Sequence, residues 1–386
     1  MNASQSGSRT RAKSRSTSDK SSKTRKSSAY DAGFEQHLID HGIYPHGHEY
    51  TDEDSSVYPD NWEEINERLA QPRPSLSPSL FSREAFRKFE KKNMQALTEG
   101  TVMSKAFPII TGDADIPSQE NIPFGNLEDL TDGSITKAQP DFYDGSRPAE
   151  LDKQIRGELG PYIVPSTNKS APCLPNFFAE GKGPTGSTPV AKRQACYDGA
   201  LGARGVHELR SRVDQETAFD NNAYTITSTY HGGAGVLSIF TTHATPSNNV
   251  EVPIEYRMTQ LNAFAMTGNP DTFRQGASAL RNARDWAKEK REELITAANS
   301  IMPETRSFTV ESSTESLLSL STNDIAQLES DTSTDELAII PPPDARSTRN
   351  APAGIRSNYS SRSSSNRRSK KKAARASKAS AIGSGD

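Results

Sequence analysis

The sequence predicts one α/β domain, a single mixed sheet flanked by helices, between long disordered tails. Three observations lead to this prediction. Hydrophobic residues make up only 32% of the 386-residue chain, so one core of ordinary size with long uncovered stretches is the simplest fit. Charge is separated into blocks of one sign at both ends of the chain. Between these blocks, segments with a helical period alternate with segments of strand period.

The charge blocks define the predicted organisation. Residues 1–28 carry eight Lys/Arg and one Asp, and residues 356–386 carry nine Lys/Arg and one Asp. Residues 29–70 instead hold eleven Asp/Glu and one Arg, and residues 303–344 hold nine Asp/Glu and one Arg. Such blocks are usually solvated and flexible. We therefore expect a disordered basic Ser-rich tail over 1–29 and an acidic partly helical arm over 30–74. The α/β domain follows over 75–302, then an acidic disordered linker over 303–355 and a basic disordered tail over 356–386.

Composition also excludes several classes of protein. No run of eighteen apolar residues exists, so we expect no membrane span. From the polar, basic N-terminus we expect no secretory signal, and from only two cysteines we expect no disulfide framework. Dense basic clusters lie at residues 23–26 and 367–372. They predict binding of import receptors and a location in the nucleus, or in nucleus and cytoplasm.

Several helices are expected from apolar spacing and end signals. Ser82 begins one that runs to about Gly100, and Asn269 caps another that ends near Asn299. The remaining helices are expected at two short places in the acidic arm and over residues 151–159, 190–201 and 255–267.

Strands are expected where β-branched and aromatic residues alternate or form short buried runs. Residues 224–230 and 236–242 flank a Gly-rich turn and predict a hairpin. Further extended segments are expected over residues 108–110, 137–142, 162–164 and 176–179.

One constellation carries chemistry: Pro140-Asp141, then Glu180-Gly181-Lys182, then Gln194. Asp141 and Glu180 at the ends of adjacent strands are the oxygen ligands that Mg²⁺ or Mn²⁺ prefers. Lys182 shares a strand face with Glu180, because side chains alternate with period two, and can stabilise charge or orient water. Gln194 on the next helix would support a phosphate or the attacking water.

This constellation resembles the PD-(D/E)XK superfamily of restriction-endonuclease-like nucleases. The resemblance implies a restriction-endonuclease-like core with Asp141 and Glu180 as metal ligands. The chain is also similar to an uncharacterised domain family common in fungal genomes, over about residues 30–300. That similarity rests on PDFYDG (140–145), NFFAEGKGPTG (176–186), RQACYDGALGARG (193–205) and MTQLNAFAMTGNP (258–270). The departure is the 39-residue separation of Asp141 from Glu180, which makes Asp144 an alternative ligand.

Competing interpretations of these residues stay open. A second E-x-K, Glu90 to Lys92, falls on a predicted helix, where the two residues would not share a strand face. Glu180 and Lys182 could equally be an ordinary charge pair at a strand end. His37 and His41 share a helix face, but without a clear further ligand, surface histidines are the better interpretation.

The leading functional prediction is a metal-dependent nuclease-type domain that acts on nucleic acid in the nucleus. Phosphate contact is expected from the basic tails and from a lining over 182–212, made by Lys182, Lys192, Arg193, Arg204, Arg210 and Arg212. The alternative is a non-catalytic nuclear adaptor, with a degenerate nuclease-like fold, whose charged tails recruit partners.

Overall fold

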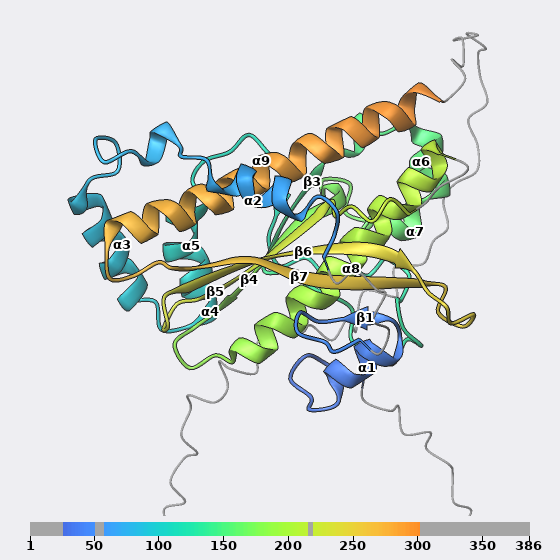
Figure 1. Cartoon of the computed structure of the whole chain (residues 1–386), viewed down its shortest axis with the longest axis horizontal. Coiled ribbons are helices and arrows are strands. Elements are labelled where there is room, and N and C mark those ends of the chain that lie inside the picture. Colours follow the sequence, from blue (N-terminus) through green and yellow to red (C-terminus); the bar gives the residue numbers. More distant parts are fainter. Residues whose placement is uncertain (1–25, 51–57, 215–218, 302–386) are drawn as a thin grey trace, which may run out of the picture. The chain divides into compact units, whose positions relative to one another are not determined.

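The computed structural model describes residues 26–50, 58–214 and 219–301. Its centre is one mixed seven-stranded sheet with helices on both sides, which confirms the predicted α/β class (Figure 1). The acidic linker and the C-terminal basic tail lie outside the described residues, as does the N-terminal tail up to residue 25.

The strand order across the sheet is β1-β7-β6-β5-β4-β3-β2. β4 runs parallel to β5 and β1 runs parallel to β7, whereas the other neighbours are antiparallel. The strands are β1 (Ile43–Tyr44), β2 (Ser118–Gln119), β3 (Phe142–Ser146), β4 (Cys173–Lys182), β5 (Thr225–His231), β6 (Val236–Pro246) and β7 (Ile254–Ala265).

Two long helices cover the sheet, α8 on one face and α9 on the other (Figure 1). The α-helices are α1 (Phe34–Asp40), α2 (Trp62–Ala70), α3 (Arg83–Met94), α4 (Glu99–Thr101), α5 (Phe107–Thr111), α6 (Lys153–Glu158), α7 (Gly160–Ile163), α8 (Thr188–Val213) and α9 (Pro270–Ser300). Short 3₁₀ turns η1 (Pro74–Leu76) and η3 (Pro148–Glu150) and a π-helical turn η2 (Val102–Ala106) complete the described elements.

β4 is buried on both faces, which separates the core into two layers. Phe177 and Ala179 pack with α9, α2 and α3, whereas Phe178 packs with α8 and α1. Because strand side chains alternate, Glu180 and Lys182 point to the same side as Phe178, toward α8.

Most of the elements expected from sequence are present. The hairpin is β5–β6, the buried run at 176–179 lies within β4, and α6 lies within residues 151–159. α3 begins after Ser82, whose hydroxyl accepts from the Ala85 N–H, and α9 begins after Asn269, whose side chain accepts two backbone N–H bonds. The helix expected over 190–201 is much longer, because small residues such as Gly199 and Gly202 let α8 continue in close contact with the sheet. The segment expected over 137–142 becomes a strand only at Phe142.

Three expected elements were wrong in type. The segment expected as a helix over 255–267 forms most of β7, which ends at Ala265, since pairing with β6 outweighs the helix propensity of Met, Gln, Leu and Ala. Residues 108–110 lie in α5, where Pro108 occupies an early helical position and Ile110 is buried in the core. Residues 162–164 were expected as a strand, but Tyr162 and Ile163 end α7, which begins with Gly160 and Pro161.

None of the helices in the described part of the chain is both long and apolar enough to cross a bilayer. This finding agrees with the expectation of no membrane span within those residues.

Two arginines of α9 anchor β3 through buried polar contacts. Arg284 Nε and one terminal nitrogen donate to the two oxygens of Asp144, at 2.8 and 2.9 Å, and both side chains are almost fully buried. Arg291 Nε donates to the Ser146 hydroxyl at 3.0 Å, and the Arg291 guanidinium also contacts the Asn176 side chain on β4. These contacts hold β3 beside β4, and therefore hold the segment that enters β3.

Replacing Arg284 with Met should destabilise the fold by about 3–5 kcal/mol, because Asp144 would remain as an uncompensated buried charge. Chemical denaturation of the full chain measures this. The double variant Arg284→Met/Asp144→Leu should recover most of the loss. As control, Lys88→Met removes a mostly exposed pair with Glu84 and should cost at most about 1 kcal/mol. Equal effects of Arg284→Met and Lys88→Met would contradict the anchoring role.

Candidate active site

Antiparallel pairing of β3 and β4 brings Asp141 and Glu180 together. Phe142 lies opposite Ala179, so Asp141, just before β3, lies beside Glu180, near the end of β4. The backbone N–H of Asp141 donates to Glu180 Oε1 at 3.3 Å, and the backbone N–H of Gly181 donates to Asp141 Oδ2 at 2.7 Å. The 39-residue separation therefore does not keep them apart. Asp144, the alternative ligand, is instead bound by Arg284.

Lys182 points into the same cluster and binds a residue from another element. Its Nζ donates to Glu99 Oε2 at 2.7 Å, with the Lys182 side chain fully buried and that of Glu99 8% exposed. Glu99 is the first residue of α4, where Thr98 and Thr101 form a reciprocal capping box. This capped turn fixes the backbone of Glu99 beside the end of β4.

α8 closes the cluster on the other side. Asp198 and Gln194 are both buried and lie four residues apart, hence on one face of the helix. The Asp198 carboxylate is near enough to Glu180 to raise the pKa of that residue. Asp141, Glu180 and Lys182 thus meet directly, and Gln194 lies on the helix face that approaches them.

Like charges in a buried place dominate the electrostatics. Burial raises the pKa of Glu180 well above its ordinary value, and the carboxylates of Asp141 and Asp198 raise it further. Burial also raises the pKa of Asp141, against the opposing effect of Lys182. For Lys182, burial lowers the pKa, but the carboxylates around it outweigh burial and the pKa is raised. Asp141, Glu180 and Glu99 surround the single ammonium of Lys182, and Asp198 lies near Glu180, so negative charge is in excess and the cluster favours a further cation.

The donor set fits a hard divalent cation. Glu180 Oε2 is buried and accepts no hydrogen bond from the described residues, which leaves an oxygen lone pair available in the cluster. Carboxylate oxygens are the ligands that Mg²⁺ and Mn²⁺ prefer. Asp141 and Glu180 are the residues that would hold such an ion.

The basic residues expected to line the site over 182–212 are engaged within the fold. Five contact acidic side chains or backbone oxygens and the sixth, Lys192, lies 6.0 Å from the ring centre of Phe240. The pairs are Lys182 with Glu99, Arg193 with Glu35, Arg204 with the carbonyls of Glu128 and Asp129, Arg210 with Asp220, and Arg212 with Glu158. Most of these pairs join α8 to neighbouring segments and so stabilise its position.

Two members of the cluster were missed from sequence. Asp198 lies four residues after Gln194 on a predicted helix, so helical spacing was a usable signal. Glu99 had no such signal, because it comes from a separate element and reaches Lys182 only through tertiary packing.

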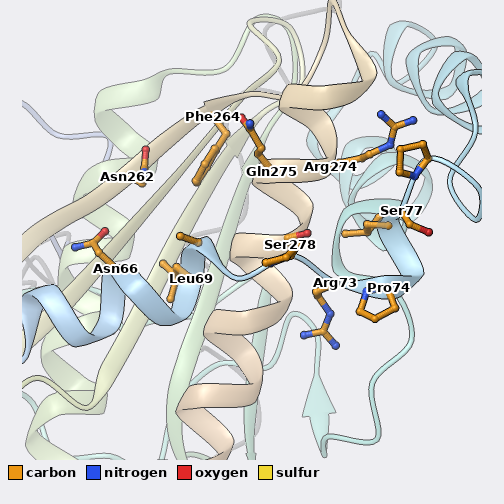
Figure 2. A pocket seen from close by; sticks show the side chains of 14 residues that line it. Asn66, Leu69, Arg73, Pro74, Ser77, Asn262, Phe264, Arg274, Gln275 and Ser278 are labelled. Atoms are coloured by element: carbon orange, nitrogen blue, oxygen red, sulfur yellow. The ribbon is translucent and has the colours of Figure 1, made fainter.

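A groove of about 840 Å³ lies away from this cluster, between α2, η1, β7 and α9. Figure 2 shows Leu69, Phe264 and Ser278 on its walls. It belongs to the α9 side of the sheet, whereas Glu180 and Lys182 face α8. None of the residues that line this groove is an Asp or a Glu.

Comparison with known proteins gives one match. Residues 102–298, a little more than half of the chain, match the family model described as "Domain of unknown function (DUF7924)". The match includes Asp141, Glu180, Lys182, Gln194 and Asp198, whereas Glu99 lies just before it. No curated protein and no solved structure matches the chain.

Glu180→Gln should stabilise the metal-free protein at high pH and have less effect at low pH. The folded chain holds the Glu180 proton to higher pH than the unfolded chain does, since its pKa is raised. Wild-type stability therefore falls as pH rises from the unfolded pKa, about 4.3, through the raised folded value, and the variant escapes this loss. Melting temperatures of wild type and Glu180→Gln, recorded in EDTA from pH 5 to 8, measure this difference in stability.

The control is Glu90→Gln on α3, which makes the same substitution outside the carboxylate cluster. The expected result is a difference in melting temperature between Glu180→Gln and wild type that grows as pH rises. A difference that stays constant or shrinks would contradict the burial of Glu180 among like charges.

Proposed function

We propose that this chain, which belongs to the DUF7924 family, is a metal-dependent nuclease with a restriction-endonuclease-like core. The observation that carries the proposal is the meeting of Asp141, Glu180 and Lys182 at the end of β4. Two carboxylates and an ammonium in one cluster are groups that metal-assisted phosphodiester hydrolysis can use, and the excess of buried carboxylates favours a divalent ion.

Mg²⁺ or Mn²⁺ held by Asp141 and Glu180 would lower the pKa of a bound water and offset charge on the phosphate. The protein's own residues supply the rest. Lys182, held by Glu99, keeps an ammonium beside the reacting group and stabilises the charge that develops there. Gln194 on α8 orients the phosphate or the water. Burial strengthens each of these interactions by excluding solvent.

The exposed face of α3 supports contact with a phosphate backbone. It carries five exposed basic residues, Arg83, Arg87, Lys88, Lys91 and Lys92, against two acidic ones. Asn93, at the end of this helix, donates to the carbonyl of Gly232 at 2.7 Å, and the Gly232 N–H donates to the carbonyl of Lys182 at 2.8 Å. The basic helix is thus tied to the strand that carries the site, and with the basic tails it offers the charge that nucleic acid requires.

A second candidate is a non-catalytic nuclear adaptor that keeps the fold without the reaction. The observation that favours it is the internal pairing of the basic residues over 182–212, together with complete burial of Lys182. In that case Lys182 and Glu99 serve as a structural ion pair, and the charged tails carry the interactions.

The full-length protein should cleave single- or double-stranded DNA or RNA in Mg²⁺ or Mn²⁺. Asp141→Asn, Glu180→Gln and Lys182→Met should each lower the rate at least about a hundredfold, since several kcal/mol of charge stabilisation disappears. Gel assays with end-labelled substrates measure this.

Glu90→Gln, in the second E-x-K of the chain, is the matched control and should keep full activity. Cleavage that survives Asp141→Asn and Lys182→Met would come from a contaminant. Absence of cleavage by the wild type, with no metal-dependent rise in melting temperature, would favour the adaptor.

We also propose that the basic clusters at residues 23–26 and 367–372 direct the protein to the nucleus. A fluorescent fusion lacking residues 9–26 and 365–386 should lose nuclear accumulation, because import receptors bind dense Lys/Arg clusters. Deletion of residues 311–332 from the acidic linker, equal in length to the C-terminal deletion, should leave it unchanged. Nuclear accumulation without both basic segments would refute this location signal.

A further inference from the structure

We infer that His37, His41 and Asp132 form a second metal site, for a zinc-class transition ion, that fastens the N-terminal segment 26–50 to the domain. One ligand atom of each residue lies within 4.8 Å of the others. The two histidines come from α1 and the residue that follows it, and Asp132 comes from the loop that leads toward β3. Sequence spacing alone indicates two histidines on one face, and tertiary structure adds the third ligand.

The spacing of the ligand atoms suits a small tetrahedral ion. His37 Nε2 lies 3.3 Å from Asp132 Oδ1. Two ligands of a tetrahedral ion with bonds of about 2.0–2.2 Å lie roughly 3.3–3.6 Å apart. The His37 and His41 ring centres are 4.5 Å apart, so a small rotation of the half-buried His41 side chain completes the set. Three protein ligands leave the fourth position to water.

Hydrogen bonds within the cluster prepare His41 for a metal. His41 Nδ1 lies 2.8 Å from the backbone carbonyl of His37, which can only accept a hydrogen bond. Nδ1 therefore carries the proton, and Nε2 of the neutral ring keeps its lone pair. A backbone carbonyl that binds the second ring nitrogen is the usual support of a metal-binding histidine. The Ser134 hydroxyl donates to Asp132 Oδ1 at 2.6 Å and also lies 3.1 Å from His37 Nε2, so it holds the two ligand atoms close together and would give up the contact with His37 when an ion binds.

The segment that the ion would fasten lies against the candidate active site. Ser27 exchanges backbone hydrogen bonds with Ser134 and Thr136, on either side of Ile135. On α8, Arg193 binds the Ala29 carbonyl and the Glu35 carboxylate, one residue before Gln194. Tyr30 lies within electrostatic reach of Lys182. An ion at His37, His41 and Asp132 would thus join this segment to the 132–136 loop and hold it over α8.

Nitrogen ligands separate this site from the carboxylate cluster. Two imidazoles and one carboxylate favour Zn²⁺ or a neighbouring transition ion over Mg²⁺, whereas Asp141 and Glu180 offer only oxygen. The two sites therefore respond to different metals and can be tested separately.

The test is titration of metal-stripped, full-length protein with Zn²⁺ in the absence of Mg²⁺, followed by calorimetry, with Co²⁺ as a visible-absorption probe. We expect one tight Zn²⁺ site that slows hydrogen exchange over residues 27–44 and 132–136. His37→Ala, His41→Ala and Asp132→Asn should each weaken binding at least about tenfold. Asp132 lies outside the N-terminal segment 26–50. If Asp132→Asn keeps the wild-type melting temperature in EDTA, its weaker Zn²⁺ binding is not caused by unfolding.

His48→Ala, in the same segment and stacked on Tyr44, is the matched control and should keep the wild-type affinity for Zn²⁺. Glu180→Gln should keep it as well, even if the protein cleaves nothing. Equal Zn²⁺ affinity in wild type and His41→Ala would overturn the site. So would loss of the tight site in Glu180→Gln alone, since the ion would then occupy the carboxylate cluster.

Discussion

Burial of like charges at the end of β4 is the constraint on which the arrangement around α8 depends. Asp141, Glu180 and Asp198 approach one another where little water can screen them, and a single ammonium, that of Lys182, lies among them. Desolvated carboxylates are stable only when hydrogen bonds, cations or protons offset their repulsion. The backbone N–H groups of Asp141 and Gly181 provide part of this, and Glu99 in turn fixes Lys182.

The opposite face of the sheet holds these groups in position. Arg284 and Arg291 of α9 contact polar side chains of β3 and β4. These buried contacts, together with backbone pairing, stabilise the register that places Asp141 beside Glu180. α8 is held in a similar way, because Arg193, Arg204, Arg210 and Arg212 join it to the segments around it. Much of the basic charge near the site therefore serves the fold. If the proposed function holds, the exposed basic residues of α3 and the basic tails would contact the substrate.

The N-terminal segment connects the two proposed metal sites. Phe34 packs edge-on against Tyr197 of α8, and Glu35 pairs with Arg193 on the same helix. Groups that hold this segment also limit the movement of the helix that carries Gln194 and Asp198. Residues well before the matched family region therefore help to hold α8 in place.

The sequence by itself determined the class of fold, the β5–β6 hairpin and the start of α3 and α9, because these depend on local patterns and caps. It also singled out Asp141, Glu180 and Lys182 as candidates, but the pairing of β3 with β4 is what brings Asp141 to Glu180. It did not determine β7, whose helix-forming residues extend only because β6 lies beside them. Nor did it show that Glu99 reaches Lys182 or that Asp132 joins His37 and His41. These groups come from separate elements, and a contact between distant segments is decided by how the sheet and helices pack, which no local pattern encodes.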